Sequence, residues 1–254
     1  MSYKSSKYFT TLNKKKIKYF FLNKKSQITI VFFHGFMSNM IGSKPMSIQK
    51  FCKKKKVNFL RFEYSGHGKS SGEFTKGNIS SWTKDSKQLI KSKIKKNESL
   101  IFIGSSMGSW IALNLFLSFK NQIKGFIGIS SAPEFLEELM WKKFSKKIKK
   151  KIMNNNIYHL NHGGFTYPLS KQLILDGRKN KVLNNKINLK IPIVLFHGLK
   201  DNIVPLTVSK KILKICKNSN KRLIIIKNGD HRLSRKNDLK KIHKELSLLL
   251  FNIF

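Results

Sequence analysis

The segment from Ser99 to Phe119 constrains the fold of this 254-residue chain more than any other part of it. It begins with a short apolar run, 99–103, which predicts a buried strand, and ends with SWIALNLFLSF, 109–119, which predicts a buried helix. Between them stands Gly104-Ser105-Ser106-Met107-Gly108. A G-x-S-x-G sequence at a strand-to-helix turn is typical of a nucleophile elbow, in which a strained turn exposes the central hydroxyl. Ser106 is therefore the candidate nucleophile.

The context of the motif matters more than the motif. With the Gly and Ser content of this chain, G-x-S-x-G should arise by chance in roughly one chain in ten of this length. A second copy, Gly68 to Gly72, is followed by residues 73–77, which show no helical apolar period, so we predict a loop there. At the first copy, glycines two positions either side of Ser106 remove Cβ atoms where strand and helix cross.

Two further strand-like runs are each followed by a residue that suits a Ser–acid–His arrangement. Asp201 follows the run 191–196, and His231 follows the run 222–226. The order Ser, acid, His along the chain accompanies a nucleophile elbow, and loops at the carboxyl ends of parallel strands converge. Asp230 also follows a strand but adjoins His231, so it has difficulty reaching the Nδ1 atom of its neighbour. The other acids between Ser106 and His231 follow no strand-like run: Glu134, Glu137, Glu138 and Asp176.

The chemistry of acyl transfer calls for these residue types. A serine hydroxyl is a weak nucleophile, so a His must take its proton, and a buried carboxylate fixes the imidazole tautomer. The oxyanion that develops needs preorganised donors. We expect one to be the backbone N–H of Met107, and the other to be that of Phe36, in the loop after a predicted strand over 28–33. His34 and His197 each precede Gly after a predicted strand, and we expect them to stabilise turns.

Together these segments resemble the α/β-hydrolase superfamily, from about Ile28 to the C-terminus. The motifs that carry the resemblance are His34-Gly35-Phe36 after a strand, the loop from Glu63 to Ser70, the elbow at Ser106, Asp201 and His231. The resemblance implies a twisted, mostly parallel sheet flanked by helices, with a small cap insertion. It also implies a serine esterase or thioesterase that works through an acyl-enzyme. A peptidase, a monoacylglycerol lipase or a C–C-bond hydrolase would use the same fold and triad, so these alternatives stay open.

A narrower resemblance rests on two loops. HGFMSNMIGSK, 34–44, and GSSMGSWIAL, 104–113, are similar to a smaller group of bacterial serine hydrolases and a mitochondrial palmitoyl-protein thioesterase that also cleaves acyl glucuronides. This implies a small-molecule or acyl-protein substrate. Ser109 departs from the group, in which Gly is expected at that position.

The alternation of strands and helices divides the chain. We predict a hydrolase core over 28–131 and 190–254, a cap or lid over 132–189, and an N-terminal segment over 1–27 with an edge strand at 17–22. Further strands are expected at 57–64 and 123–129, helices at 44–55, 207–215 and 238–250, and a hairpin at 157–167. Apolar cap residues directly after the strand that ends near Ser130 are expected to line the substrate pocket: Phe135, Leu136, Trp141 and Phe144.

The formal net charge of +40 comes from 52 Lys and Arg against 12 Asp and Glu. A basic nucleic-acid-binding or membrane-binding protein is therefore the alternative from another class. Only five of these cations are Arg, whereas phosphate and base recognition favours Arg, and the lysines are spread over every segment. We interpret the charge as codon bias and predict no specific nucleic-acid partner.

One cap segment keeps the membrane alternative open. Trp141, Phe144, Ile148 and Ile152 fall near one face of a predicted helix amid many lysines. Such a helix either packs within the cap or makes weak contact with an anionic membrane.

Other features predict little additional chemistry. Cys52 and Cys216 lack metal-type spacing and are expected to be buried free thiols, and His159 and His162 lack partners at ligand spacing. We predict no metal and no cofactor. No run approaches the roughly 20 apolar residues of a membrane span, and the first 25 residues lack the apolar core of a secretory signal, so we expect a cytoplasmic location. His67 and His243 are expected on the surface or in loops.

Overall fold

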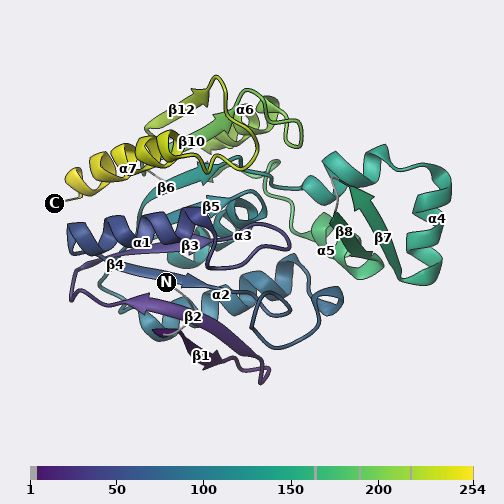
Figure 1. The fold of residues 1–254 in the computed structure, drawn as a ribbon, viewed down its shortest axis with the longest axis horizontal. Helices are drawn as coiled ribbons and strands as arrows, with labels where there is room; N and C mark the ends of the chain where they lie inside the picture. Colours follow the sequence, from purple (N-terminus) through teal and green to yellow (C-terminus); the bar gives the residue numbers. More distant parts are fainter. Residues whose placement is uncertain (1–4, 163–164, 189, 218, 254) are drawn as a thin grey trace.

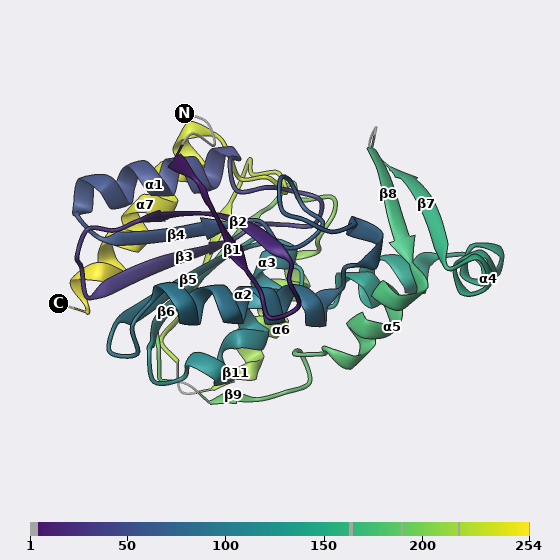
Figure 2. The ribbon, with the colours of Figure 1, turned by 90° about the horizontal axis from the view of Figure 1, so that it is seen from below.

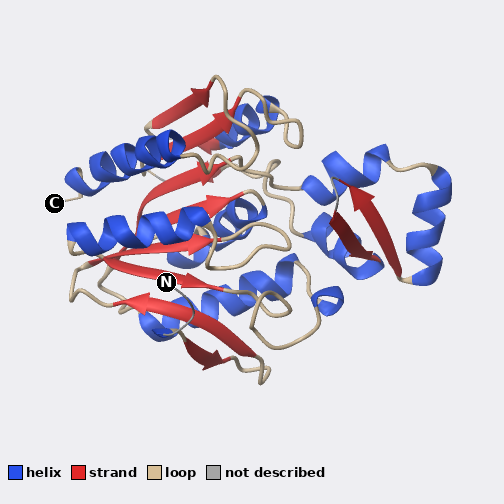
Figure 3. Ribbon diagram, in the orientation of Figure 1, coloured by secondary structure: helices blue, strands red, loops and turns tan. Residues whose placement is uncertain are grey.

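The computed structural model describes residues 5–162, 165–188, 190–217 and 219–253. Its centre is an eight-stranded sheet with strand order β1-β2-β4-β3-β5-β6-β10-β12 (Figures 1 and 3). The strands from β4 to β12 are parallel, and β1 and β2 are antiparallel to their neighbours. Their bounds are β1 (Lys7–Thr10), β2 (Lys16–Leu22), β3 (Ile28–Phe33), β4 (Asn58–Phe62), β5 (Ser99–Ser105), β6 (Ile123–Ile129), β10 (Ile193–Gly198) and β12 (Lys221–Ile226).

Helices cover both faces of this sheet (Figure 2). On one face, Ile30 and Phe32 of β3 belong to the same core cluster as Ile48 and Leu246. Val31 and Phe33, which point the other way, belong to the cluster of the opposite face. Because both faces are covered, the central strands are continuous apolar runs. The first face carries α1 (Ser43–Lys55) and α7 (Lys236–Phe251), and the second carries α2 (Ile79–Lys93), α3 (Met107–Leu115) and α6 (Leu206–Ile215).

The predicted fold class is confirmed, with two local corrections. The strand predicted over 17–22 exists as β2, but it is not at the edge, because β1 pairs with it in antiparallel register. The strand predicted over 191–196 is shifted and runs to Gly198, so His197 lies within β10. Cys52 and Cys216 are buried free thiols, as predicted.

The segment between β6 and β10 projects from one end of the sheet (Figure 1). It holds a hairpin of β7 and β8, as predicted for 157–167, although Gly163 and Gly164 lie outside the described residues. A two-stranded pairing of β9 with β11 lies where the chain returns to the core. The bounds are η4 (Leu136–Met140), η5 (Trp141–Lys143), α4 (Lys146–Asn155), β7 (Ile157–His162), β8 (Phe165–Ser170), α5 (Lys171–Lys179), β9 (Ile187–Asn188) and β11 (Cys216–Lys217), with η2 (Phe74–Lys76) and η3 (Leu117–Phe119) in the core.

The prediction of one amphipathic helix from Trp141 to Ile152 is wrong. Phe144 has extended backbone between η5 and α4, and Ser145 caps α4 by accepting a hydrogen bond from the backbone N–H of Ile148. Ile152 is fully buried, so the apolar side of α4 packs inside the protein.

None of the helices in the described part of the chain is long and apolar enough to span a membrane. Within the same ranges, no group of three or more His, Cys, Asp or Glu side chains lies close enough to hold a metal ion.

Candidate active site

Ser106 lies at the turn between β5 and α3 in a strained backbone conformation, with φ 52° and ψ −121°. Positive φ in a non-glycine residue is uncommon, and here it turns the chain sharply from strand to helix. A Cβ atom on Gly108 would overlap the carbonyl oxygen of Phe33, and one on Gly104 would overlap the backbone of Ser109. The two glycines are therefore required where α3 crosses β3 and β5, as the motif predicts.

The departure at Ser109 is accommodated by hydrogen bonds. Its hydroxyl donates to the carbonyl oxygen of Gly104 at 2.8 Å and accepts from the hydroxyl of Ser131 at 2.8 Å. Because the buried hydroxyl both donates and accepts a hydrogen bond within the protein, these bonds replace those that it made to water, and its burial carries no penalty for an unpaired polar group.

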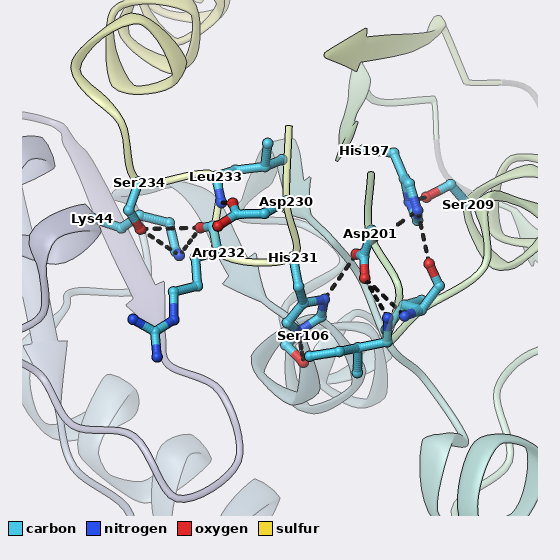
Figure 4. A network of polar contacts seen from close by, with 12 residues as sticks. Lys44, Ser106, His197, Asp201, Ser209, Asp230, His231, Arg232, Leu233 and Ser234 are labelled. Atoms are coloured by element: carbon cyan, nitrogen blue, oxygen red, sulfur yellow. Dashed lines mark hydrogen bonds and ion pairs between the residues drawn. The ribbon is translucent and has the colours of Figure 1, made fainter. Parts of the chain in front are cut away.

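The structure brings Ser106, His231 and Asp201 together, although they come from three separate loops (Figure 4). The Nε2 atom of His231 lies 3.1 Å from the Oγ atom of Ser106. The Nδ1 atom of the same ring lies 2.8 Å from Oδ2 of Asp201. These contacts are satisfied when Nδ1 carries the proton and donates to Asp201, which leaves Nε2 to accept from Ser106.

The Asp201 carboxylate is held from several sides. Its side chain has no exposed area, whereas 18% of the His231 side chain is exposed. Oδ1 of Asp201 accepts hydrogen bonds from the backbone N–H groups of Ile203 and Val204, both at 2.9 Å. Burial alone would raise the pKa of Asp201, but the hydrogen bond and charge of His231 and these two N–H groups outweigh it and lower the pKa. The carboxylate is therefore ionised and fixed in orientation.

Both expected oxyanion donors belong to backbone that adjoins Ser106. Met107 is the first residue of α3, and the first N–H groups of a helix have no acceptor within it. Phe36 follows Gly35, and a Cβ atom on Gly35 would lie 3.4 Å from Cβ of Ser106. The loop after β3 therefore packs directly beside the elbow.

The Phe36 side chain is the centre of an aromatic cluster that joins the core to the cap. Its ring centroid lies 5.1 Å from that of Phe74, 5.3 Å from Phe135, 6.2 Å from Tyr167 and 6.4 Å from Trp82. We call these five side chains the aromatic cluster. Phe135 comes from the start of the cap and Tyr167 from β8, so two cap segments meet a residue beside the elbow.

The other three predicted pocket residues take part in packing contacts. Leu136 is only 1% exposed. The Trp141 ring lies under the guanidinium of Arg178 at 4.8 Å and the ammonium of Lys149 at 5.7 Å. Phe144 is half-buried against the core cluster that contains Val31, Phe33 and Ile152. Of the four, Phe135 is the residue that the structure places against Phe36.

His197 and His34 lie outside this arrangement and are held in place by hydrogen bonds. His197 bonds through Nδ1 to the Ser209 hydroxyl at 2.8 Å and through Nε2 to the Val204 carbonyl at 3.0 Å, which fixes the turn that carries Asp201. The Nδ1 atom of His34 bonds to the Gly35 carbonyl at 2.8 Å. Both are buried, and their predicted role in turns is confirmed. His67 lies in a loop as expected but is buried, whereas the prediction for His243 is wrong because it lies on α7, half-buried.

Several residues near the site were not predicted. Tyr167 and Phe74 join the aromatic cluster only because the cap hairpin and η2 fold over Phe36. Lys44 reaches the loop after His231 from α1 (Figure 4). Sequence spacing carries no signal for such contacts, since they link segments far apart in the chain.

Known proteins with similar sequences and structures agree with this architecture. A family model described as "Serine aminopeptidase, S33" matches residues 24–162, more than half of the chain. The chain is 28% identical over 214 residues to the bovine "Palmitoyl-protein thioesterase ABHD10, mitochondrial". The aligned region covers 83% of this chain and 69% of the relative. That relative is mitochondrial by name, and the cytoplasmic location of this chain stays a prediction.

Two solved structures match almost the whole chain. A putative hydrolase from Agrobacterium vitis S4 has a TM-score of 0.91 and 26% identity, over 96% of this chain and 98% of its own. The alpha/beta hydrolase domain-containing protein 10 from mouse has a TM-score of 0.89 and 25% identity, over 98% and 100%. The match to the family model, together with this fold, shows that the chain is a hydrolase that belongs to the family described as "Serine aminopeptidase, S33", within the α/β-hydrolase superfamily.

Proposed function

We propose that this protein is a serine esterase or thioesterase in which Ser106, His231 and Asp201 form the catalytic triad. The observation that carries the proposal is the unbroken line of contacts from Asp201 through His231 to Ser106 at the strained turn. A nucleophile, a base within hydrogen-bond reach and a group that orients the base are the parts that acyl transfer needs.

The reaction follows from these positions. The Oγ atom of Ser106 attacks the carbonyl carbon of the ester or thioester while Nε2 of His231 takes the hydroxyl proton. The N–H groups of Met107 and Phe36 stabilise the oxyanion. As the bond to the leaving group breaks, His231 returns the proton to the leaving alkoxide or thiolate, and an acyl-enzyme remains. Water, activated by the same imidazole, then attacks the acyl carbon and releases the carboxylic acid and Ser106.

The environment of the site favours an apolar acyl group. The aromatic cluster lies around Phe36, whose backbone N–H is the proposed oxyanion donor, so apolar surface adjoins the reacting carbonyl. Each buried CH₂ of an acyl chain is worth about 0.8 kcal/mol. The curated relative described above is named a palmitoyl-protein thioesterase, which agrees with a medium-to-long acyl chain. Lysines of the cap, such as Lys149 over Trp141, favour a polar or anionic leaving group by screened attraction.

A peptidase is the second candidate, because the matching family model is described as a serine aminopeptidase. The same triad cleaves amides, so the substrate pocket rather than the triad distinguishes the two activities.

A panel of substrates tests the proposal. We expect hydrolysis of p-nitrophenyl esters and acyl-CoA, with kcat/KM rising with chain length, little cleavage of an aminoacyl p-nitroanilide, and loss of all turnover in Ser106→Ala. Ser70→Ala, in the second G-x-S-x-G sequence, is the matched control and should keep the kinetics of the wild type after its folding is checked. Ester hydrolysis that survives in Ser106→Ala would refute the mechanism. A flat chain-length profile would refute the acyl pocket, and faster cleavage of the anilide would favour the peptidase.

A further inference from the structure

Lys44 joins α1 to the loop that carries His231. It is the second residue of α1, and its ammonium donates to the backbone carbonyl of Arg232 and to the hydroxyl of Ser234, the latter at 3.3 Å (Figure 4). Arg232 directly follows His231 in the chain. A charged donor on a neighbouring helix therefore binds the backbone one residue from the proposed general base.

The loop needs such a restraint because its backbone is strained. Leu233 has a φ of 44°, a left-handed conformation that is rare for a leucine. The side chain of Leu233 is buried, and its N–H donates to Oδ1 of Asp230 at 2.9 Å. Before His231 in the chain, the carbonyl of Gly229 accepts a hydrogen bond from the backbone N–H of Lys200 at 2.8 Å. On the side of the loop that leads to α7, the Ser234 hydroxyl also donates to the Arg232 carbonyl at 3.1 Å, and Arg235 donates to the Asn228 carbonyl at 2.5 Å. Lys44 adds a donor from outside the loop, on α1.

The placement of Lys44 is electrostatically unfavourable, which argues that the contact has a role. The side chain is half-buried, and α1 has no acidic residue in its first turn, where a cation opposes the helix dipole. The pKa of Lys44 is lowered to about 8: burial is the largest cause, the charge of Arg232 acts in the same direction, and the carboxylates of Asp230 and Asp238 act against both. The folded protein therefore disfavours this ammonium, yet the chain places it against the loop.

We propose that Lys44 is a positioning residue, whose ammonium group fixes the His231 loop so that the imidazole stays between Asp201 and Ser106. The inference rests on the proposed function, since it assigns Lys44 to the same site. The carbonyl of Arg232 is the acceptor through which Lys44 acts, and Lys44 touches none of the reacting atoms.

This arrangement makes turnover sensitive to alkaline pH. Above about pH 8 the ammonium loses its proton, and the neutral amine is a weaker donor to the Arg232 carbonyl. The charged groups that act on Lys44 are Asp230 and Arg232 in the loop and Asp238 on α7. His243 of α7 also faces α1, through a contact of 3.0 Å with Ser47.

Three variants test the inference with p-nitrophenyl butyrate as substrate, from about pH 6 to about pH 10. Lys44→Met removes the donor, Lys44→Arg keeps a cation that does not titrate in this range, and Lys50→Met removes an exposed lysine from the same helix. The readouts are kcat and KM separately, the pH profile, the rate of labelling by a fluorophosphonate, and the melting temperature.

We expect Lys44→Met to lower kcat about 10- to 100-fold with little change in KM, because a small misplacement of a catalytic group has costs of that size. Its melting temperature should change little, since Met keeps most of the apolar stem of the half-buried lysine side chain. Lys44→Arg should restore most of kcat, and its turnover should begin to fall only at a higher pH than in the wild type. Lys50→Met should match the wild type.

Two outcomes would overturn the inference: a Lys44→Met enzyme with the kcat and pH profile of the wild type, or a folded Lys44→Arg enzyme that is as slow as Lys44→Met. If Lys44→Met does not fold, the inference is overturned when Lys44→Arg loses turnover at the same alkaline pH as the wild type. The proposed function fails separately, if Ser106→Ala keeps its turnover. Turnover that depends on Ser106 but ignores Lys44 contradicts this inference alone.

Discussion

Replacement of Asp201 by Asn tests the acid assignment, because the structure fixes how the new amide must lie. Oδ1 of Asp201 accepts two backbone N–H groups, from Ile203 and Val204. An amide NH₂ in that place would face two donors, so the amide oxygen of Asn must stay there. The NH₂ group then faces Nδ1 of His231, where Oδ2 stands now, at 2.8 Å.

This orientation forces the wrong tautomer on the imidazole. An NH₂ donor requires Nδ1 of His231 to be an acceptor, so the proton moves to Nε2. A protonated Nε2 cannot take the proton of Ser106. The equivalent change in a serine protease lowers kcat about 10⁴-fold, and we expect a loss of about 10³- to 10⁴-fold here, or about 4 to 5 kcal/mol in the activation free energy.

Steady-state hydrolysis of p-nitrophenyl butyrate measures this loss, with circular dichroism to show that the variant is folded. KM should change little, because Asp201 is buried and acts through His231. Asp176→Asn is the matched control. Asp176 lies on α5, and its carboxylate accepts from the backbone N–H of Ser80 at 2.9 Å, whereas Nδ1 of His231 contacts Asp201. An active Asp201→Asn beside an inactive Asp176→Asn would refute the assignment.

Three further predictions concern the scaffold. Gly108→Ala should lower the free energy of unfolding in urea by about 3 kcal/mol, since the added methyl overlaps the Phe33 carbonyl; an unchanged value would contradict the crowding argument. Glu134→Ala should speed proteolysis of the cap, because its carboxylate accepts the N–H of Val182 at 2.8 Å and a buried unpaired N–H costs about 1 to 3 kcal/mol; wild-type cleavage rates would count against it. Burial lowers the pKa of His67 to about 4. Between about pH 6.5 and about pH 4 the unfolded chain therefore binds more protons than the folded protein, and the free energy of unfolding should fall by up to about 3 kcal/mol as the pH is lowered through this range. Urea unfolding at both ends of this range should show a smaller fall in His67→Phe than in the wild type, and equal falls would be inconsistent with a buried neutral imidazole.

The core of the fold is predictable from the sequence because its signals are local. The strand expected over 123–129 is β6, and strands buried on both faces are apolar throughout. The elbow is equally local, since Gly104, Ser106 and Gly108 stand within five residues. Asp201 and His231 follow from chain order and from their places after strands.

The remaining features depend on contacts between distant segments. β1 has mostly exposed side chains and exists through its pairing with β2, so it shows no apolar pattern. The predicted helical face through Phe144 is wrong because Ser145 starts a new helix there. Tyr167 reaches Phe36 only when the cap hairpin folds back, and nothing in the spacing of either residue predicts this contact.

The central claim is that Ser106 is the nucleophile of a covalent mechanism. Incubation with a fluorophosphonate, followed by intact-mass measurement and peptide mapping, tests it most directly. We predict a single adduct on Ser106, formed slowly in His231→Ala and not at all in Ser106→Ala. An adduct on Ser70, or labelling that persists in Ser106→Ala, would contradict the claim.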